Sequence, residues 1–172
     1  KREIGQLQPF ELAISIMIAD LASIPMTDIG IPIFNGITIP GVKLGLANIV
    51  ILVILYTYSF KDALFVSILR VFLVSILRTG LFSLSFYFSL VGSLFALIGM
   101  KLFQKYSKLS MIGVSIVGSM MHSVGQIIVA SIFLHNALVF HYLPWILLLS
   151  IPTGIFTGII SKQLYSALQK IL

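Results

Sequence analysis

The chain contains no cysteine, and only 9% of its 172 residues are charged. The absence of cysteine excludes disulfides, thiolate metal ligands and cysteine nucleophiles. A water-soluble domain of this length needs many more charges to cover its surface, whereas 59% of these residues are hydrophobic and the mean hydropathy is +1.12. The composition therefore predicts an all-α protein that spans a lipid bilayer.

Acidic residues are missing from the whole chain after Asp62. The five that exist are Glu3, Glu11, Asp20, Asp28 and Asp62, against eleven Lys and Arg, which gives a formal charge of +6. The cations stand singly between apolar runs and do not gather on one face, so membrane topology explains them better than a nucleic-acid partner does.

Motifs for energy-coupled or hydrolytic chemistry are also absent. There is no phosphate-binding G-x-x-x-x-G-K-[ST] loop, no H-E-x-x-H and no G-x-S-x-G, so the chain cannot energise transport by itself. No D-D-x-x-D motif exists to hold magnesium against a pyrophosphate, which argues against a catalytic prenyl synthase. We expect no enzymatic activity, no metal site and no cofactor.

Six apolar runs, each bounded by polar, Pro or Gly residues, divide the chain. Each is long enough to cross a bilayer or nearly so, which predicts a single transmembrane domain over residues 1–172 with six helices. The first run is interrupted by Asp20 and Pro25, unlike a cleaved signal peptide. The runs cover about residues 10–24, 44–59, 63–77, 81–103, 109–134 and 143–164.

The positions of the lysines predict the orientation. If the N-terminus is cytoplasmic, eight of the eleven cations fall in cytoplasmic segments, as the positive-inside rule requires: Lys1, Arg2, Lys61, Lys101, Lys105, Lys108, Lys162 and Lys170. The opposite side holds Lys43 and Arg78, together with a loop that carries His135 and His141. Both termini are then cytoplasmic.

Polar residues inside the predicted helices point to a binding site. Arg70 falls near the bilayer midplane, where a cation costs several kcal/mol unless it faces a cavity or a partner. His122 and Gln126 share a helix face at about the same depth, and Asn48 lies one turn into its helix. With Lys43 and Arg78 at the rim, these residues form a polar funnel that opens outward.

Structural roles compete with this interpretation. Ser, Asn, Gln and His often only bridge helices in a membrane, which is an equal alternative for His122 and Gln126. An ion pair with Asp20, the only carboxylate expected inside the membrane, is the leading structural explanation for Arg70. The rim cations Lys43 and Arg78 can equally extend to lipid phosphates.

Small residues recur at four-residue spacing in two helices. Ser15, Ala19 and Ser23 form one ladder, and Gly154 and Gly158 form a G-x-x-x-G pair. Such spacing lets helices approach closely in lipid, and most such pairs serve internal packing. The first ladder is equally suited to docking another membrane subunit.

From Ile39 onward the chain resembles the Gx transporter family, also described as heptaprenyl diphosphate synthase component I and related to the substrate-binding S components of energy-coupling-factor transporters. The resemblance lies in the stretch Ile39-Pro-Gly-Val-Lys-Leu-Gly-Leu-Ala-Asn-Ile49, the helix with Arg70, the stretch from Phe82 to Gly92, the Ser115-x-x-Gly118-x-x-x-His122-x-x-x-Gln126 pattern and Tyr142-Leu-Pro144. It covers residues 38–172 and implies an S-component-like bundle of six helices.

The segment 1–37 departs from that pattern and instead resembles the N-terminal membrane segment of YetF-like proteins. The chain therefore resembles two different segments that are joined near Ile37. In S components the first helix docks on a shared transmembrane T subunit, a role that the Ser15, Ala19 and Ser23 ladder can still fill.

As the resemblance implies, the protein is a substrate-binding subunit of an uptake transporter of the bacterial cytoplasmic membrane, driven by a T subunit and two ABC ATPases. The predicted pocket is Lys43, Asn48, Arg70, Arg78, His122 and Gln126, and its three cations without a carboxylate favour a small anionic ligand. Phe82, Phe86, Phe88 and Phe95 would suit an apolar tail, although Phe at such spacing more often packs or faces lipid. Two alternatives are a non-catalytic membrane partner of a prenyl diphosphate synthase or redox assembly, and a scaffold without a ligand.

Overall fold

The computed structural model describes residues 46–169, and over that range the chain is helical, without a strand. The five predicted apolar runs that fall there all form helices, and the first run lies outside the described residues. The α4 helix continues into a short π-helix, and α7 follows a 3-10 turn. The elements are α3 (Leu46–Thr57), α4 (Phe60–Val74), η2 (Ser75–Thr79), α5 (Leu84–Tyr106), α6 (Met111–Leu134), η3 (Ala137–Tyr142) and α7 (Leu143–Gln169).

Serine caps set where three of the helices begin. Ser59 accepts from the backbone N–H of Asp62, whose carboxylate accepts in return from the Ser59 N–H, so α4 starts with a capping box. Ser83 caps α5 by accepting from the Phe86 N–H at 3.2 Å, and Ser110 caps α6 by accepting from the Gly113 N–H at 3.3 Å. Each cap satisfies an amide that would otherwise be unpaired, which fixes the turns between long helices.

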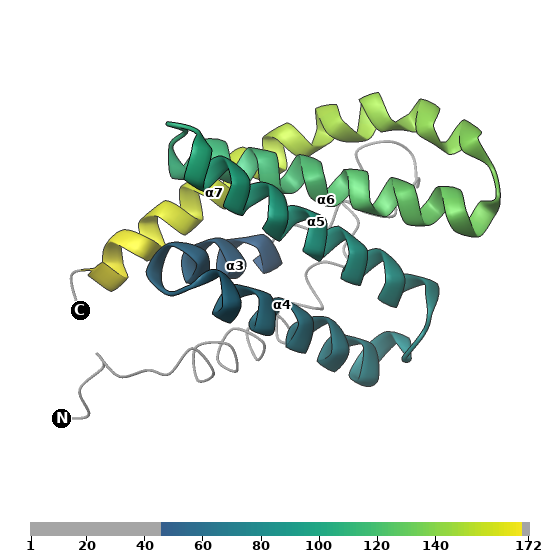
Figure 1. The fold of residues 1–172 in the computed structure, drawn as a ribbon, viewed down its shortest axis with the longest axis horizontal. Coiled ribbons are helices and arrows are strands. Elements are labelled where there is room, and N and C mark those ends of the chain that lie inside the picture. Colours follow the sequence, from purple (N-terminus) through teal and green to yellow (C-terminus); the bar gives the residue numbers. More distant parts are fainter. Residues whose placement is uncertain (1–45, 170–172) are drawn as a thin grey trace, which may run out of the picture.

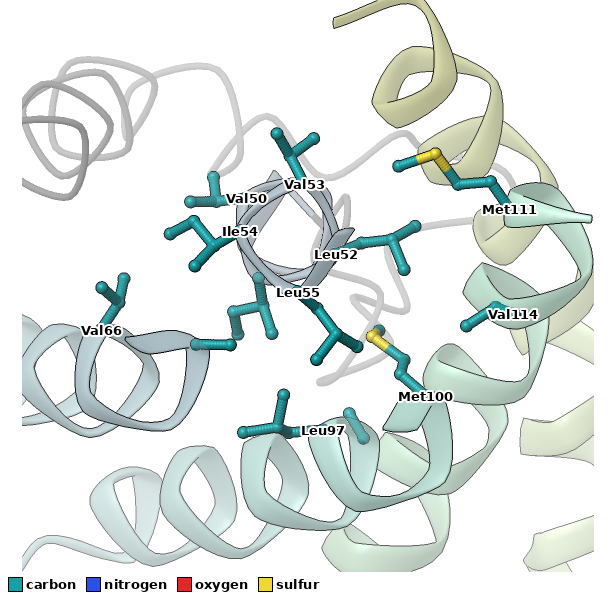
Figure 2. Packing of buried hydrophobic residues seen from close by; sticks show 13 residues of the cluster. Val50, Leu52, Val53, Ile54, Leu55, Val66, Leu97, Met100, Met111 and Val114 are labelled. Carbon is teal, nitrogen blue, oxygen red and sulfur yellow. The ribbon is translucent and has the colours of Figure 1, made fainter. Parts of the chain in front are cut away.

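The α3 helix forms the centre of the described bundle. Every residue from Asn48 to Leu55 is buried, and α3 contacts α4, α5, α6 and α7. Figure 2 shows its labelled side chains pointing outward in several directions, with Leu97 and Met100 of α5 on one side and Val114 of α6 on another. A helix that is apolar all round suits such a central position.

Glycines bring α5 and α6 into close contact. A Cβ atom on Gly99 would lie 2.7 Å from Cγ of Met121, and one on Gly118 would lie 2.1 Å from Cε of Met100. Each helix therefore places a large side chain over a glycine of the other. Since lipid gives helices no hydrophobic reason to associate, such close packing supplies much of the attraction.

The G-x-x-x-G pair of α7 packs against α6. A Cβ atom on Gly154 would lie 2.6 Å from Cα of Ile116, and one on Gly158 would lie 2.8 Å from Cα of Ile112. The expectation that this pair serves internal packing is confirmed.

Two buried hydroxyl pairs hydrogen-bond across the same α6–α7 interface. They are Ser115 with Thr157 at 2.8 Å and Ser123 with Ser150 at 2.6 Å. In lipid, which offers no competing water, such side-chain hydrogen bonds between helices add to the packing.

Each of the helices from α4 to α7 runs antiparallel to the one before it, so their connections lie at two ends of the bundle (Figure 1). We call one the lysine-bearing end: it consists of the α3–α4 connection, the α5–α6 connection and the C-terminal part of α7. The far end holds the α4–α5 connection and η3. All lysines of the described range lie within about two turns of the lysine-bearing end, as helical geometry places them: Lys61, Lys101, Lys105, Lys108 and Lys162.

Three segments of residues 46–169 are long and apolar enough to cross a membrane: Leu84–Tyr106, Met111–Leu134 and Ala137–Gln169. The α3 helix has 12 residues and α4 has 15, each shorter than the roughly 20 that a straight crossing takes. Large apolar side chains are exposed along α5, α6 and α7, among them Trp145 at 69%. These properties are those of a membrane protein, whose outer surface meets lipid.

Candidate functional site

Four of the six predicted pocket residues lie in the described part of the chain with their side chains: Asn48, Arg70, His122 and Gln126. Arg78 falls in η2, but its side chain is not among those that the structure describes. Lys43 lies outside the described residues, as does the predicted docking ladder of Ser15, Ala19 and Ser23, and so does Asp20. The predicted Asp20–Arg70 pair is therefore untested.

Arg70 belongs to the inward-facing stripe of α4. It follows Val66 by four residues and Ser67 by three, and both of those side chains are buried. Residues three and four apart share a helix face, so Arg70 continues this stripe, and its side chain is itself half-buried. Ten residues separate it from Phe60, which places it about 15 Å along the helix from the lysine-bearing end.

His122 lies midway along α6, against α5. A Cβ atom on Gly92 would lie 2.8 Å from Cε1 of the His122 ring, so the absence of a side chain at Gly92 makes room for the imidazole. One turn later, a Cβ atom on Gly125 would lie 3.0 Å from Cα of Gly92, which shows how closely the backbones approach here. Gln126 follows at the next position and is half-buried.

These four residues lie within a layer of the bundle about 9 Å deep, which we call the polar level. Asn48, which is 7% exposed, precedes the end of α3 by nine residues, and Gln126 follows the start of α6 by fifteen. At 1.5 Å per residue the four lie about 14 to 23 Å from the lysine-bearing end. They come from three helices, of which α4 and α6 do not pack on each other in the described range and both pack on α5.

Ser67 is a candidate that the sequence analysis missed. Its side chain is 1% exposed, and its hydroxyl has no hydrogen-bond partner within the part of the chain that the structure describes. A buried hydroxyl without a partner is costly, which makes it a candidate donor to a bound group. Its position one turn before Arg70, on the same face, was the available signal in the sequence.

An open hollow of about 440 Å³, which no sequence pattern predicts, lies at the lysine-bearing end. It is lined by Tyr56, Thr57, Tyr165 and Gln169. The two tyrosine rings meet edge to face at 6.0 Å between centroids, and the Gln169 amide donates to the Tyr165 hydroxyl at 2.8 Å. The hollow is at the opposite end from the rim of the predicted funnel, and neither α3 nor α7 carries a polar periodicity that predicts it.

The phenylalanines that were expected to suit an apolar tail differ in exposure. Phe86 is 3% exposed and contacts the rings of Phe72, Phe82 and Tyr87 edge to face, so it serves packing. Phe82 is largely exposed in the α4–α5 connection, with a positive φ of 62°. No group of three His, Cys, Asp or Glu side chains that could hold a metal ion occurs among the residues described.

Taken together, these observations define a membrane protein that is helical over the described residues, with ionisable and amide side chains about 14 to 23 Å from the lysine-bearing end. Residues 17–164 match the family model of heptaprenyl diphosphate synthase component I, and the chain belongs to that family. This confirms the resemblance that the stretch from Ile39 and the Ser115 to Gln126 pattern predict. The matched range begins at residue 17 and so crosses Ile37, the position of the predicted join.

No curated protein and no solved structure shows a significant match to the chain.

Proposed function

We propose that the protein is the substrate-binding membrane subunit of an energy-coupling-factor-type uptake transporter, with a small anionic ligand. One observation carries the proposal: Arg70 continues the buried stripe of α4 about 15 Å from the lysine-bearing end, a costly position for a cation that serves only packing. The membership in a membrane family and the lack of nucleotide-binding motifs agree with a subunit that others energise.

In this proposal each side chain of the pocket has a binding role that follows from its chemistry. The Arg70 guanidinium offers two parallel donors to a phosphate or carboxylate group, and His122 and Gln126 add hydrogen bonds from α6. Asn48 contributes an amide from α3, while Lys43 and Arg78 attract the anion at the outer rim. The ligand is bound and released without any bond being made or broken.

The proposed topology has six membrane-crossing helices in one domain, with both termini in the cytoplasm of a bacterium. The gathering of the described lysines at one end supports it, because short cytoplasmic segments retain Lys and Arg. The T subunit then docks on the Ser15, Ala19 and Ser23 face, and two ABC ATPases act through it.

A second candidate is a non-catalytic membrane component of a prenyl diphosphate synthase. The family description, which names a component of such an enzyme, favours it, as does the lack of an aspartate-rich magnesium motif in the chain. In that case Arg70 pairs with Asp20 and the polar level serves structure.

The first experiment is a mild-detergent purification of the tagged chain from its own host, followed by mass spectrometry of proteins and small molecules. Recovery of two ATPases with a T subunit, and of an anion lost in the Arg70→Ala variant, is the expected result. Recovery of a prenyl synthase or of redox subunits without ATPases would reject the transporter proposal in favour of the second candidate.

A further inference from the structure

Over the described range, the lysine-bearing end carries five lysines and one carboxylate. Asp62 is the one acidic residue of positions 46–169. Its Oδ2 atom accepts from the Ser59 N–H at 3.1 Å and from the Ser59 hydroxyl at 2.7 Å, so it is committed to the cap of α4. Four of the five lysines at this end are exposed, and Lys101 is half-buried.

The α5–α6 connection, residues 107–110, presents its charges in a defined arrangement. Lys105 at the end of α5 places its Nζ 5.1 Å from the ring centroid of Tyr106, a residue that is 75% exposed. Ser107 then closes the turn: its hydroxyl donates to the Phe103 carbonyl and accepts from the Leu109 N–H. Lys108 projects from this closed turn and is exposed.

Exposed apolar side chains flank these lysines on both sides. Leu102 and Phe103 precede the turn and Leu109 follows it, and α5 is one of the helices suited to crossing a membrane. Lysines interleaved with such residues lie where hydrocarbon gives way to headgroups, and a tyrosine at the end of a membrane helix prefers the same level. A lipid headgroup reaches this surface more readily than a soluble acidic protein does.

We propose that the α5–α6 connection binds the phosphate group of an anionic phospholipid. Lys105 and Lys108 contact the phosphate, and Tyr106 holds Lys105 in position while its ring lies among the headgroups. The start of α6 at Met111, with no acidic residue in its first turn, adds positive potential to the same turn. This inference does not depend on the proposed transport function.

The test compares lipid binding to the whole chain in detergent, using phosphatidylglycerol and phosphatidylcholine as probes and native mass spectrometry to measure the first bound lipid. The Lys105→Gln/Lys108→Gln variant removes two charges from the connection. The control Lys61→Gln/Lys162→Gln removes two charges from the same end but from other helices. A lysine near a headgroup is worth about fivefold in affinity, so the first variant should lose about 5- to 25-fold for phosphatidylglycerol and little for phosphatidylcholine.

Three further measurements complete the test. The preference of the native chain for phosphatidylglycerol should decline as salt is raised, a result that needs no variant to fold. Tyr106→Leu keeps the apolar surface but removes the ring, and it should lose part of the preference. Circular dichroism of each variant checks that the helices are retained.

Several results would overturn the proposal. They are equal binding of the two lipids, an equal loss in both double variants, and stabilisation by free inorganic phosphate that matches the effect of the lipid. Recovery of an acidic protein that the Lys105→Gln/Lys108→Gln variant loses, with lipid binding unchanged, would assign the surface to a protein partner instead.

Discussion

At the residue scale, the polar level of the bundle depends on single side chains fitted to their neighbours. His122 occupies the space over Gly92, and Ser67 stands one turn from Arg70 with a buried hydroxyl. The positions of the four described pocket residues along their helices follow directly from the sequence, because an α-helix rises 1.5 Å per residue. The choice of Gly92 as the neighbour of His122 does not, because it depends on how α5 and α6 are aligned.

Gly92→Ala should destabilise the protein through its contact with His122. The new methyl group would lie 2.8 Å from the imidazole, so the ring must move, at a cost of about 1–3 kcal/mol. Thermal unfolding in detergent measures the loss. In a His122→Ala background the same substitution should cost much less, and a cost that persists in full would contradict the contact.

Arg70→Ala should weaken the binding of an anion far more than Arg70→Lys does. A hydrogen bond to a charged group contributes about 1.5–3 kcal/mol, which corresponds to a loss of about 10- to 150-fold in affinity. Equilibrium binding of labelled pyrophosphate to the purified chain is a suitable measurement, with unfolding checked in parallel. Unchanged affinity in a folded Arg70→Ala variant would remove Arg70 from the pocket.

The ion-pair alternative for Arg70 has its own test. If Asp20 and Arg70 form a pair, the Asp20→Arg/Arg70→Asp variant should regain stability that each single substitution loses. A double variant no more stable than the singles would leave the binding role as the better explanation.

At the scale of elements, the existence of the helices was more predictable than their boundaries. The predicted runs begin at residues 63, 81 and 109, whereas the serine caps place the starts of α4, α5 and α6 at Phe60, Leu84 and Met111. The central position of α3 was not predictable, because a helix that is apolar on every side has no face that identifies its neighbours. The hollow beside Thr57 was missed for a related reason, since it depends on where α7 ends relative to α3.

Gly154→Ala should separate α6 from α7. Its methyl group would lie 2.6 Å from Cα of Ile116, a backbone atom that cannot rotate away, so we expect a loss of at least about 1–3 kcal/mol. The control is Gly113→Ala, where the nearest atoms belong to the flexible side chain of Leu109. Equal unfolding temperatures for the two variants would contradict the close α6–α7 contact.

At the scale of the whole molecule, the lysine-bearing end and the far end differ in charge and in exposed groups. The far end carries His135 at the end of α6 and His141 within η3, and it has no lysine in the described range. This asymmetry was predicted from the sequence, because it requires only the order of the apolar runs. The direction of the asymmetry relative to the cell is a separate prediction.

Because the chain has no cysteine, single cysteines can report the orientation without background. We expect a membrane-impermeant maleimide to label His141→Cys in intact cells, and to label Lys61→Cys and Lys108→Cys after permeabilisation alone. Labelling of Lys108→Cys in intact cells would reverse the proposed topology.

The burial of α3 has a consequence for how the protein is made. The helix is synthesised before α4, α5, α6 and α7, yet all four contact it in the finished bundle. Its apolar surface is as compatible with lipid as with protein. The helix α3 can therefore be surrounded by lipid at first, and the helices made later then replace that lipid. Truncation after α5 would leave α3 without its contacts to α6 and α7, and quality-control proteases should recognise such a fragment as incomplete.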